Sequence, residues 1–278
     1  MKERILKLAK ENKISAVGVC NTDIYTEKSK GLLNKASFCA TEKIPDDVKS
    51  IIVCAFGYYA GEAKGNISRY ARGYDYHRVA KEKMEPICRL LGDNGFSAYS
   101  FADTGTLNER LLAKLSGIAF FGKNRMAIND RLGSYFFIGY ILTDCELPCD
   151  SPNTRTCIGC SKCVDVCPLG ALSEDGFCEE KCLSYITQKK GDLSEEEKTA
   201  IKNTGTIWGC DLCQEVCPHN KGIEVTDIEE FKENVISELH IDGSLSNKEF
   251  KELYGDRAFS WRGKKVLERN QKIFFGDI

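Results

Sequence analysis

The sequence predicts an α+β fold: a mixed α/β domain, then a cysteine-rich module and a short helical tail. Three observations support this. Helical and strand-like periodicities alternate through the first half of the chain, ten of the 15 cysteines fall between residues 149 and 217, and the residues after 222 are charged with helical spacing. A length of 278 residues suits about two domains. We place the boundaries at 1–148, 149–221 and 222–278.

The first elements alternate between helix and strand. Arg4 to Lys10 carries apolar residues at helical spacing, and Ile14 to Cys20 alternates in the manner of a strand. Ser50 to Tyr58 is a nearly continuous apolar run rich in β-branched residues. Such a run predicts a strand that is buried on both faces.

Turn signals bound the elements that follow. A helix from Arg78 to Leu91 ends at Gly92, and a strand is expected from Phe96 to Phe101. Leu107 to Leu115 is helical in pattern, and Ser134 to Thr143 is a strand rich in aromatic and β-branched residues.

The rest of the chain outside the cysteines is linker and tail. The prolines within residues 146–156 indicate a linker. Residues 228–239 and 247–254 have amphipathic patterns, and a basic stretch covers 262–270. That stretch is either a solvated helix face or a phosphate-binding surface.

Charge and hydropathy exclude several classes of protein. The 39 Lys and Arg against 41 Asp and Glu give a net charge of −2, which offers no overall attraction to nucleic acid. The N-terminus lacks the apolar core of a signal peptide, and no apolar run approaches the roughly 18 residues of a membrane span. We expect a cytoplasmic protein without a membrane partner, in which cysteines bind metal rather than form disulfides.

The cysteine module contains a metal-binding motif with a specific spacing. Residues 157–168 read Cys157-Ile-Gly-Cys160-Ser-Lys-Cys163-Val-Asp-Val-Cys167-Pro168, the C-x2-C-x2-C-x3-C-P spacing with which bacterial ferredoxins hold iron–sulfur clusters. Three thiolates two residues apart can each bind one corner of a cubane cluster, while the fourth points away.

A second, looser set follows, and together the two sets predict two 4Fe–4S clusters. In two-cluster ferredoxins the cysteine before proline ligates the other cluster, so we expect crossed wiring. One cluster takes Cys157, Cys160, Cys163 and Cys217, and the other takes Cys167, Cys182, Cys210 and Cys213.

Zinc is the alternative metal, because C-x2-C pairs also build zinc ribbons. The three evenly spaced cysteines and the repeated C-x3-C-P ending favour clusters. Cys149 and Cys178 are expected to be bystanders. The scattered remainder is expected to be buried thiols: Cys20, Cys39, Cys54, Cys88 and Cys145.

The first half lacks the phosphate-binding signatures of nucleotide enzymes, since neither G-x-G-x-x-G after a strand nor a Walker A sequence occurs. Polar residues gather instead in three glycine-punctuated segments, 69–77, 101–106 and 117–124. Asp103 follows a predicted strand and precedes a helix, a position that suits either a site residue or a helix N-cap. His77 is either a structural histidine or part of a site.

These segments together resemble the epoxyqueuosine reductase family. The resemblance runs in order from about residue 50 to 270, through residues 69–77, Ala102-Asp-Thr-Gly105, Gly122-Lys-Asn124, 133–139, 142–144, the first cysteine set, 182–187 and 209–214. It implies a cobalamin and two 4Fe–4S clusters in an oxidoreductase that removes the epoxide oxygen from a modified tRNA base. Reductive dehalogenases share this pairing of cofactors.

The resemblance also implies site residues. Asp103 matches the family's proton donor, and burial beside a corrin is expected to raise its pKa. The cobalamin is expected, in the base-off form, between the first domain and the cluster module, against Asp103, Lys123, Asn124, Ala127, Ser134 and Ile138. Tyr140 stands where the family commonly has a glutamate.

The implied partners are tRNA and an external low-potential electron donor, for a protein expected to be a monomer. From the resemblance we expect a short form of the family, without its C-terminal helical repeat. Two alternatives remain open: a paralogue that reduces another small electrophile, and a two-cluster electron carrier with no organic substrate.

Overall fold

The computed structural model describes residues 1–30, 44, 47–174 and 176–276. These divide into two compact units. The first comprises Met1–Tyr58, Tyr76–Ile158 and Ile223–Ile228, and the second comprises Tyr59–Asp75, Gly159–Gly222 and Glu229–Ile278. This division differs from the three consecutive segments expected from the sequence. Residues 59–75 and most of the expected helical tail belong to the same unit as residues 159–221 of the cysteine module, whereas residues 149–158 and 223–228 belong to the first unit.

The first unit is built on a four-stranded sheet with the order β1-β2-β6-β3. Its strands are β1 (Ala16–Asn21), β2 (Ser50–Gly57), β3 (Ala98–Phe101) and β6 (Phe136–Thr143). Every pairing is antiparallel, with Val53 opposite both Gly18 and Tyr140. The antiparallel order agrees with the expected α+β class. It also removes the parallel-sheet rule as a reason to place a site at the strand ends.

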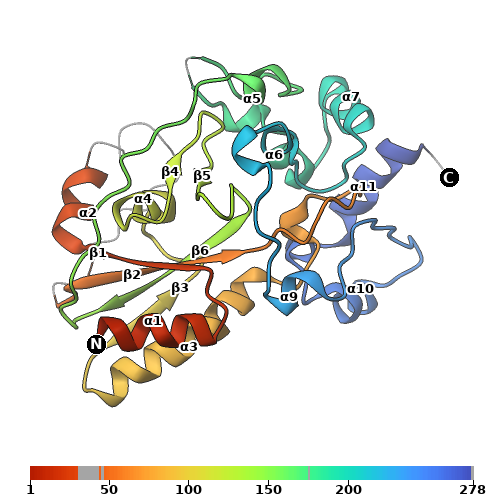
Figure 1. Cartoon of the computed structure of the whole chain (residues 1–278). Helices are drawn as coiled ribbons and strands as arrows, with labels where there is room; N and C mark the ends of the chain where they lie inside the picture. Colours follow the sequence, from red (N-terminus) through yellow and green to blue (C-terminus); the bar gives the residue numbers. More distant parts are fainter. Residues whose placement is uncertain (31–43, 45–46, 175, 277–278) are drawn as a thin grey trace. The chain divides into compact units, whose positions relative to one another are not determined.

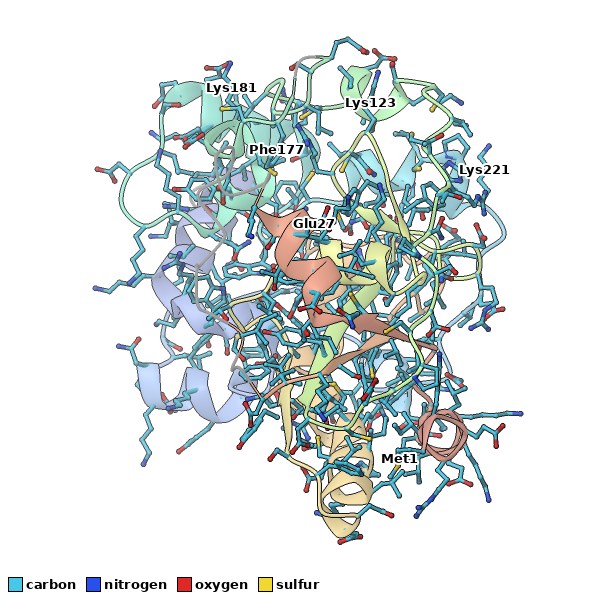
Figure 2. The ribbon with its side chains drawn as sticks, turned by 90° about the vertical axis from the view of Figure 1, so that its left-hand side faces the viewer. Met1, Glu27, Lys123, Phe177, Lys181 and Lys221 are labelled. Carbon is cyan, nitrogen blue, oxygen red and sulfur yellow. The ribbon has the colours of Figure 1, made fainter. Side chains whose placement is uncertain are left out.

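Helices cover both faces of this sheet, as Figure 1 shows. The helices α1 (Lys2–Glu11) and α3 (Tyr76–Asp93) lie on one face, and α2 (Thr22–Ser29) and α4 (Glu109–Leu115) lie on the other. In Figure 2, the label Met1 marks the side of the sheet with α1, and the label Glu27, on α2, marks the other side. Because both faces are covered, all eight residues of β2 are buried, as their apolar run predicts.

A short hairpin of β4 (Phe120–Phe121) and β5 (Ala127–Ile128) stands beside α4. The side chains of α4, including Leu111 and Leu112, pack with Ile51 and Val53 of β2 in one apolar cluster. Cys20, Cys54 and Cys145 are buried and Cys88 is half-buried, which confirms them as interior thiols. Cys39 lies outside the described residues.

The second unit is mostly short helices. They are α5 (Lys162–Asp165), α6 (Leu183–Gln188), α7 (Glu195–Thr204), α8 (Leu212–Glu215), α9 (Glu229–Lys232), α10 (Asn247–Tyr254) and α11 (Lys264–Phe275), with 3-10 turns at Arg69–Ala71, Glu179–Lys181, Pro218–Asn220 and Ala258–Arg262. Leu183, Ile186 and Ile201 form its apolar cluster. Only Glu229–Lys232 of the expected 228–239 segment is helical, and no described helix is long and apolar enough to cross a membrane.

Candidate functional site

The two cysteine motifs fold into the same local structure. Each forms one short helix, α5 or α8, before its Cys-Pro pair, and these two helices pack against each other. The backbone bonds correspond: the Cys167 amide donates to the Val164 carbonyl, and the Cys217 amide donates to the Gln214 carbonyl, both at 3.1 Å. The two sets are therefore a structural repeat, although their sequence spacings differ.

Cys167 interacts with the second cysteine set. Burial raises the pKa of Cys210 to about 12, and the charges of Cys182 and Cys167 raise it further. The pKa of Cys182 is likewise raised by burial, with Cys167 among the neighbouring charges. Burial also raises the pKa of Cys213, with contributions from the charges of Cys210 and Cys182 and, from the first cysteine set, Cys163. These four thiols thus lie close enough for their charges to interact, although 14 residues separate Cys167 from Cys182 and 27 separate Cys182 from Cys210.

The remaining cysteines differ in exposure. Cys163 and Cys217 are buried, Cys157 is half-buried and Cys160 is exposed. Cys178 is exposed, beside the exposed residues Phe177 and Lys181 (Figure 2). Within the described residues, no three His, Cys, Asp or Glu side chains have the geometry of a single-ion site. A cubane does not need that geometry, because its thiolates bind different corners.

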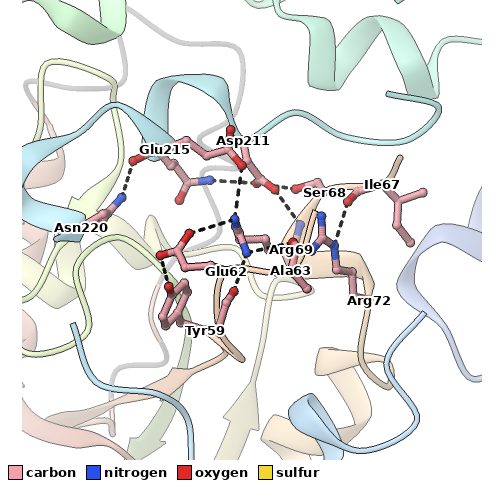
Figure 3. Close-up of polar contacts among 12 residues, drawn as sticks. Tyr59, Glu62, Ala63, Ile67, Ser68, Arg69, Arg72, Asp211, Glu215 and Asn220 are labelled. Atoms are coloured by element: carbon pink, nitrogen blue, oxygen red, sulfur yellow. Dashed lines mark hydrogen bonds and ion pairs between the residues drawn. The ribbon is translucent and has the colours of Figure 1, made fainter. Parts of the chain in front are cut away.

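A buried carboxylate anchors the second motif. Asp211, between Cys210 and Cys213, accepts hydrogen bonds from the Ser68 hydroxyl at 2.6 Å and from the Arg69 amide at 2.7 Å (Figure 3). Burial raises its pKa, and these hydrogen bonds oppose that rise. They tie residues 68–69 to the cysteine loop.

The arginines of this segment serve its structure. Arg69 donates to the Gly61 carbonyl at 2.6 Å and pairs with Glu62 and Glu215, and Arg72 donates to the Ile67 and Ala63 carbonyls (Figure 3). The polar segment 69–77 is thus divided, because Tyr76 and His77 belong to the first unit.

In the first unit, Asp103 lies two residues beyond β3, in a left-handed backbone conformation with φ of 57°. Its Oδ2 accepts a 2.5 Å hydrogen bond from the Tyr76 hydroxyl and lies 3.3 Å from His77 Nε2. Its amide donates to Glu109 Oε1 at 2.6 Å. Four groups that can carry protons therefore meet at one point.

The two carboxyl groups of this cluster have opposite pKa shifts. Hydrogen bonding to His77 is the main reason why the pKa of Asp103 lies below its usual value, and its side chain is 59% exposed. The expected rise in the pKa of Asp103 concerns burial beside a corrin and stays a prediction, because in the chain by itself that pKa is lowered. Burial instead raises the pKa of Glu109 to about 8, so Glu109 holds a proton at neutral pH. In the sequence, only the position of Glu109 at the start of a helix with apolar residues pointed to a buried carboxyl group with a raised pKa.

Asp103 does not cap a helix. The helix α4 begins at Glu109 rather than at Leu107, and its N-cap is Asn108, whose side chain accepts from the Leu111 amide at 3.0 Å. The structure thus removes the N-cap explanation for Asp103, and His77 contacts the carboxylate that the motif singled out.

The other expected cobalamin residues vary in accessibility. Lys123 and Ile138 are partly exposed, whereas Asn124, Ala127 and Ser134 are 6%, 5% and 1% exposed. The buried three can shape a cofactor surface but offer little area for contact. Asn124 also has a local role, since its Oδ1 accepts from the Met126 amide at 3.2 Å.

The glycines near this site are explained by their own neighbours. A Cβ at Gly105 would lie 1.9 Å from the Tyr140 hydroxyl, and one at Gly139 would lie 2.8 Å from Met84 Cε. Tyr140 is 1% exposed and fills the interior of the unit. These close contacts need glycine without any bound cofactor.

Comparisons with known proteins give consistent matches. Residues 156–220 match the model of a 4Fe-4S double cluster binding domain, and residues 39–104 match that of epoxyqueuosine reductase QueG, DUF1730. The cysteine module is thus a double 4Fe–4S cluster domain.

Curated relatives are named epoxyqueuosine reductase. The protein of Bacillus cereus is 38% identical over 80% of this chain, and that of Lactococcus garvieae is 34% identical over 100% of this chain and 87% of its own length. The chain spans 62% of the length of the B. cereus relative.

Solved structures agree. The epoxyqueuosine reductase from Streptococcus thermophilus matches with a TM-score of 0.82 and 32% identity, over 98% of this chain and 80% of that one. A structure of epoxyqueuosine reductase with a tRNA-Tyr epoxyqueuosine-modified stem loop has the same TM-score at 29% identity and the same coverage. A reductive dehalogenase, with a TM-score of 0.54 at 15% identity, shares the fold.

Proposed function

The chain belongs to the epoxyqueuosine reductase family, and on this basis we propose that it reduces the epoxide of epoxyqueuosine in tRNA to the alkene of queuosine. The reaction breaks both carbon–oxygen bonds of the epoxide and forms a carbon–carbon double bond. It consumes two electrons and two protons, and the oxygen leaves as water. The protein must therefore deliver electrons and supply acids. We assign the reaction to the cytoplasm and to a monomer.

The observation that carries this proposal is the cluster of proton-bearing groups around Asp103. Asp103, Tyr76, His77 and Glu109 are joined by contacts of 2.5 to 3.3 Å. Asp103 is the exposed member, so it is the group that a substrate can reach. We assign it as the proton donor to the leaving oxygen, because a general acid must lie within hydrogen-bond distance of the atom that it protonates.

The double cluster domain supplies the electrons. We assign Cys167, Cys182, Cys210 and Cys213 to one cluster, supported by the electrostatic interactions among these thiols. Cys157, Cys160, Cys163 and Cys217 are assigned to the other. An external low-potential donor reduces the clusters in this proposal.

Cobalamin, when bound, supplies the two-electron chemistry at the epoxide. Asp103, Lys123 and Ile138 have the accessible surface to contact it, and the buried Asn124, Ala127 and Ser134 support the shape of that surface. The side chains of Asp103 and Lys123 offer polar contacts, and Ile138 offers an apolar one. The mix suits a large cofactor with a flat ring and amide edges.

Turnover with a defined substrate tests the function. The cluster-loaded protein is given cobalamin, a reductant and tRNA that contains epoxyqueuosine, and queuosine is measured by mass spectrometry. Asp103→Asn keeps the side-chain shape and tolerates the left-handed backbone, so we expect intact cofactor content and a loss of turnover of about a hundredfold or more. Asp93→Asn, at an exposed position, is the matched control. Full turnover by Asp103→Asn would refute its role, and no queuosine from the fully loaded parent would refute the function.

Iron content and electron paramagnetic resonance test the wiring. In crossed wiring, Cys167→Ala loses the cluster of the second set, and Cys217→Ala loses that of the first set. Cys178→Ala is the control, because Cys178 is exposed and close in sequence to Cys182. If Cys167→Ala removed the cluster held by Cys157, Cys160 and Cys163 instead, the wiring would be uncrossed.

A further inference from the structure

The second unit contains a basic groove that the proposed chemistry does not use. A cavity of about 1040 Å³ opens between α10, the loop at residues 190–192 and the start of α11. Seven Lys or Arg side chains line it, against two carboxylates, Asp75 and Asp192. The groove is positive, although the net charge of the chain is −2.

Three of the seven cations hold the groove together. Arg269 donates to the Lys189 and Gly191 carbonyls at 2.7 and 2.6 Å. Lys264 pairs with Glu268 at 2.9 Å, and the Arg257 guanidinium lies 4.4 Å from the centre of the Tyr74 ring. These contacts fix the walls of the groove.

The other four cations are available to a ligand. Lys190, Lys251 and Lys265 are exposed and Arg262 is partly exposed. Within the part of the chain that the structure describes, none of the four has a carboxylate partner, and Arg262 Nε is buried without a hydrogen-bond acceptor. Their charges are therefore not neutralised by the protein.

The start of α11 adds to this positive surface. Its N-cap is Gly263, which provides no side-chain acceptor, and its first turn contains no acidic residue but begins Lys264-Lys265. Other helices of this unit begin differently: α7 and α10 each have a capping box, Ser194 with Glu197 and Ser246 with Glu249. Cations at a helix N-terminus are unfavourable unless an anion compensates them.

An exposed aromatic ring lies in the same groove. Trp261 is 60% exposed, its indole nitrogen donates to Gln188 at 3.2 Å, and the Arg262 guanidinium lies 3.7 Å from the centre of its ring. Both planar groups can stack on a nucleobase. An acidic protein surface would use the charges but not this ring.

We propose that this groove binds the phosphodiester backbone of RNA, with Lys190, Lys251, Lys265 and Arg262 on phosphates and Trp261 stacked on an unpaired base. The inference rests on the proposed function, for which it provides a tRNA-docking surface within this chain. Phosphate contacts give affinity and position rather than sequence specificity. The groove therefore serves any tRNA of suitable shape, whether or not its base is modified.

Fluorescence anisotropy with a labelled, unmodified tRNA transcript tests binding without chemistry. The triple variant Lys190→Ala, Lys251→Ala, Lys265→Ala is compared with the control triple Lys202→Ala, Lys232→Ala, Lys272→Ala, which changes the net charge equally at exposed positions outside the groove. Each lost phosphate contact lowers the slope of log affinity against log salt by roughly 0.7 to 0.9. We expect the groove triple to lose about 2 units of slope and about a hundredfold affinity at 0.1 M salt. The control triple should bind as the parent does.

Trp261→Ala separates stacking from charge. It should weaken binding by about tenfold and leave the salt slope unchanged. Equal RNA binding by the parent, the groove triple and Trp261→Ala would overturn the proposal. If the groove triple instead slowed cluster reduction by an acidic ferredoxin while RNA affinity stayed the same, the groove would dock the electron donor.

The two proposals fail differently. Parent turnover with groove variants that bind tRNA normally would leave the reductase function standing and reject the groove. Groove-dependent binding of tRNA without queuosine formation would do the reverse.

Discussion

Glu109→Gln tests the proton assignment beside Asp103. The glutamine keeps an oxygen where Glu109 Oε1 accepts the Asp103 amide at 2.6 Å, but it cannot ionise. Burial raises the pKa of Glu109 to about 8, so the folded protein resists ionisation of this group. Stability contributed by the neutral side chain is complete below the ordinary pKa of 4.5 and is lost as the pH rises towards 8.

The size of the effect follows from the shift. One pKa unit corresponds to about 1.4 kcal/mol. Relative to the parent, Glu109→Gln should be indistinguishable near pH 4.5, more stable by about 3 kcal/mol at pH 7, and more stable by about 5 kcal/mol above pH 8, where the difference levels off. These are upper bounds, because relaxation around the charge lowers the real cost.

Urea midpoints measured anaerobically from pH 5 to 9 check this expectation. Glu146→Gln, at an exposed loop position, controls for the loss of one negative charge. A stability difference between Glu109→Gln and the parent that is the same at pH 5 and pH 9 would refute the reasoning. The protonated carboxyl of Glu109 should also give an infrared carbonyl band at pH 7 that is absent in Glu109→Gln.

Three further predictions concern the same two sites. His77→Ala removes the main cause of the low pKa of Asp103, so that pKa should rise. In an NMR pH titration, the midpoint of the Asp103 carboxyl resonance should move to higher pH. Asn108→Ala removes the cap of α4 and should lower the free energy of unfolding by about 1 kcal/mol, whereas Asp103→Asn should not. Ser68→Ala leaves one oxygen of the buried Asp211 without its hydroxyl donor and should cost about 1 to 3 kcal/mol, measured as a lower urea midpoint.

Local patterns determined the elements that the sequence predicted well. The apolar run at residues 50–58 forms the buried strand Ser50–Gly57. The helix predicted at Arg78–Leu91 spans Tyr76–Asp93, which is two residues longer at each end. The strand and the helix both follow from the periodicity of their own residues and from the turn residues at their ends. The start of α4 was placed two residues too early, although Asn108 is a preferred N-cap residue.

Long-range pairings left no such signal. The antiparallel order β1-β2-β6-β3 depends on pairing between residues up to 93 positions apart in the chain, Ser50 with Thr143, and nothing within one strand specifies its neighbour. The same holds for Asp211, whose hydrogen-bond partners Ser68 and Arg69 lie 143 and 142 residues away. The sequence placed Arg69 in a polar segment, but it could not show that its guanidinium binds the protein's own Gly61, Glu62 and Glu215 and not a ligand.

The opposite pKa shifts of Asp103 and Glu109 suit the proposed reaction. Neighbouring carboxyl groups whose environments move their pKa values apart can divide the roles of acid and charge. In the chain by itself, Glu109 holds its proton, while the exposed Asp103 accepts hydrogen bonds from Tyr76 and His77. A substrate that covers the exposed Asp103 removes water from its side chain, and loss of water raises a carboxyl pKa. In the proposed reaction, Asp103 therefore takes up a proton when the epoxide is in place, beside the Tyr76 hydroxyl and the His77 ring that contact it, so that the acid forms where the leaving oxygen needs it.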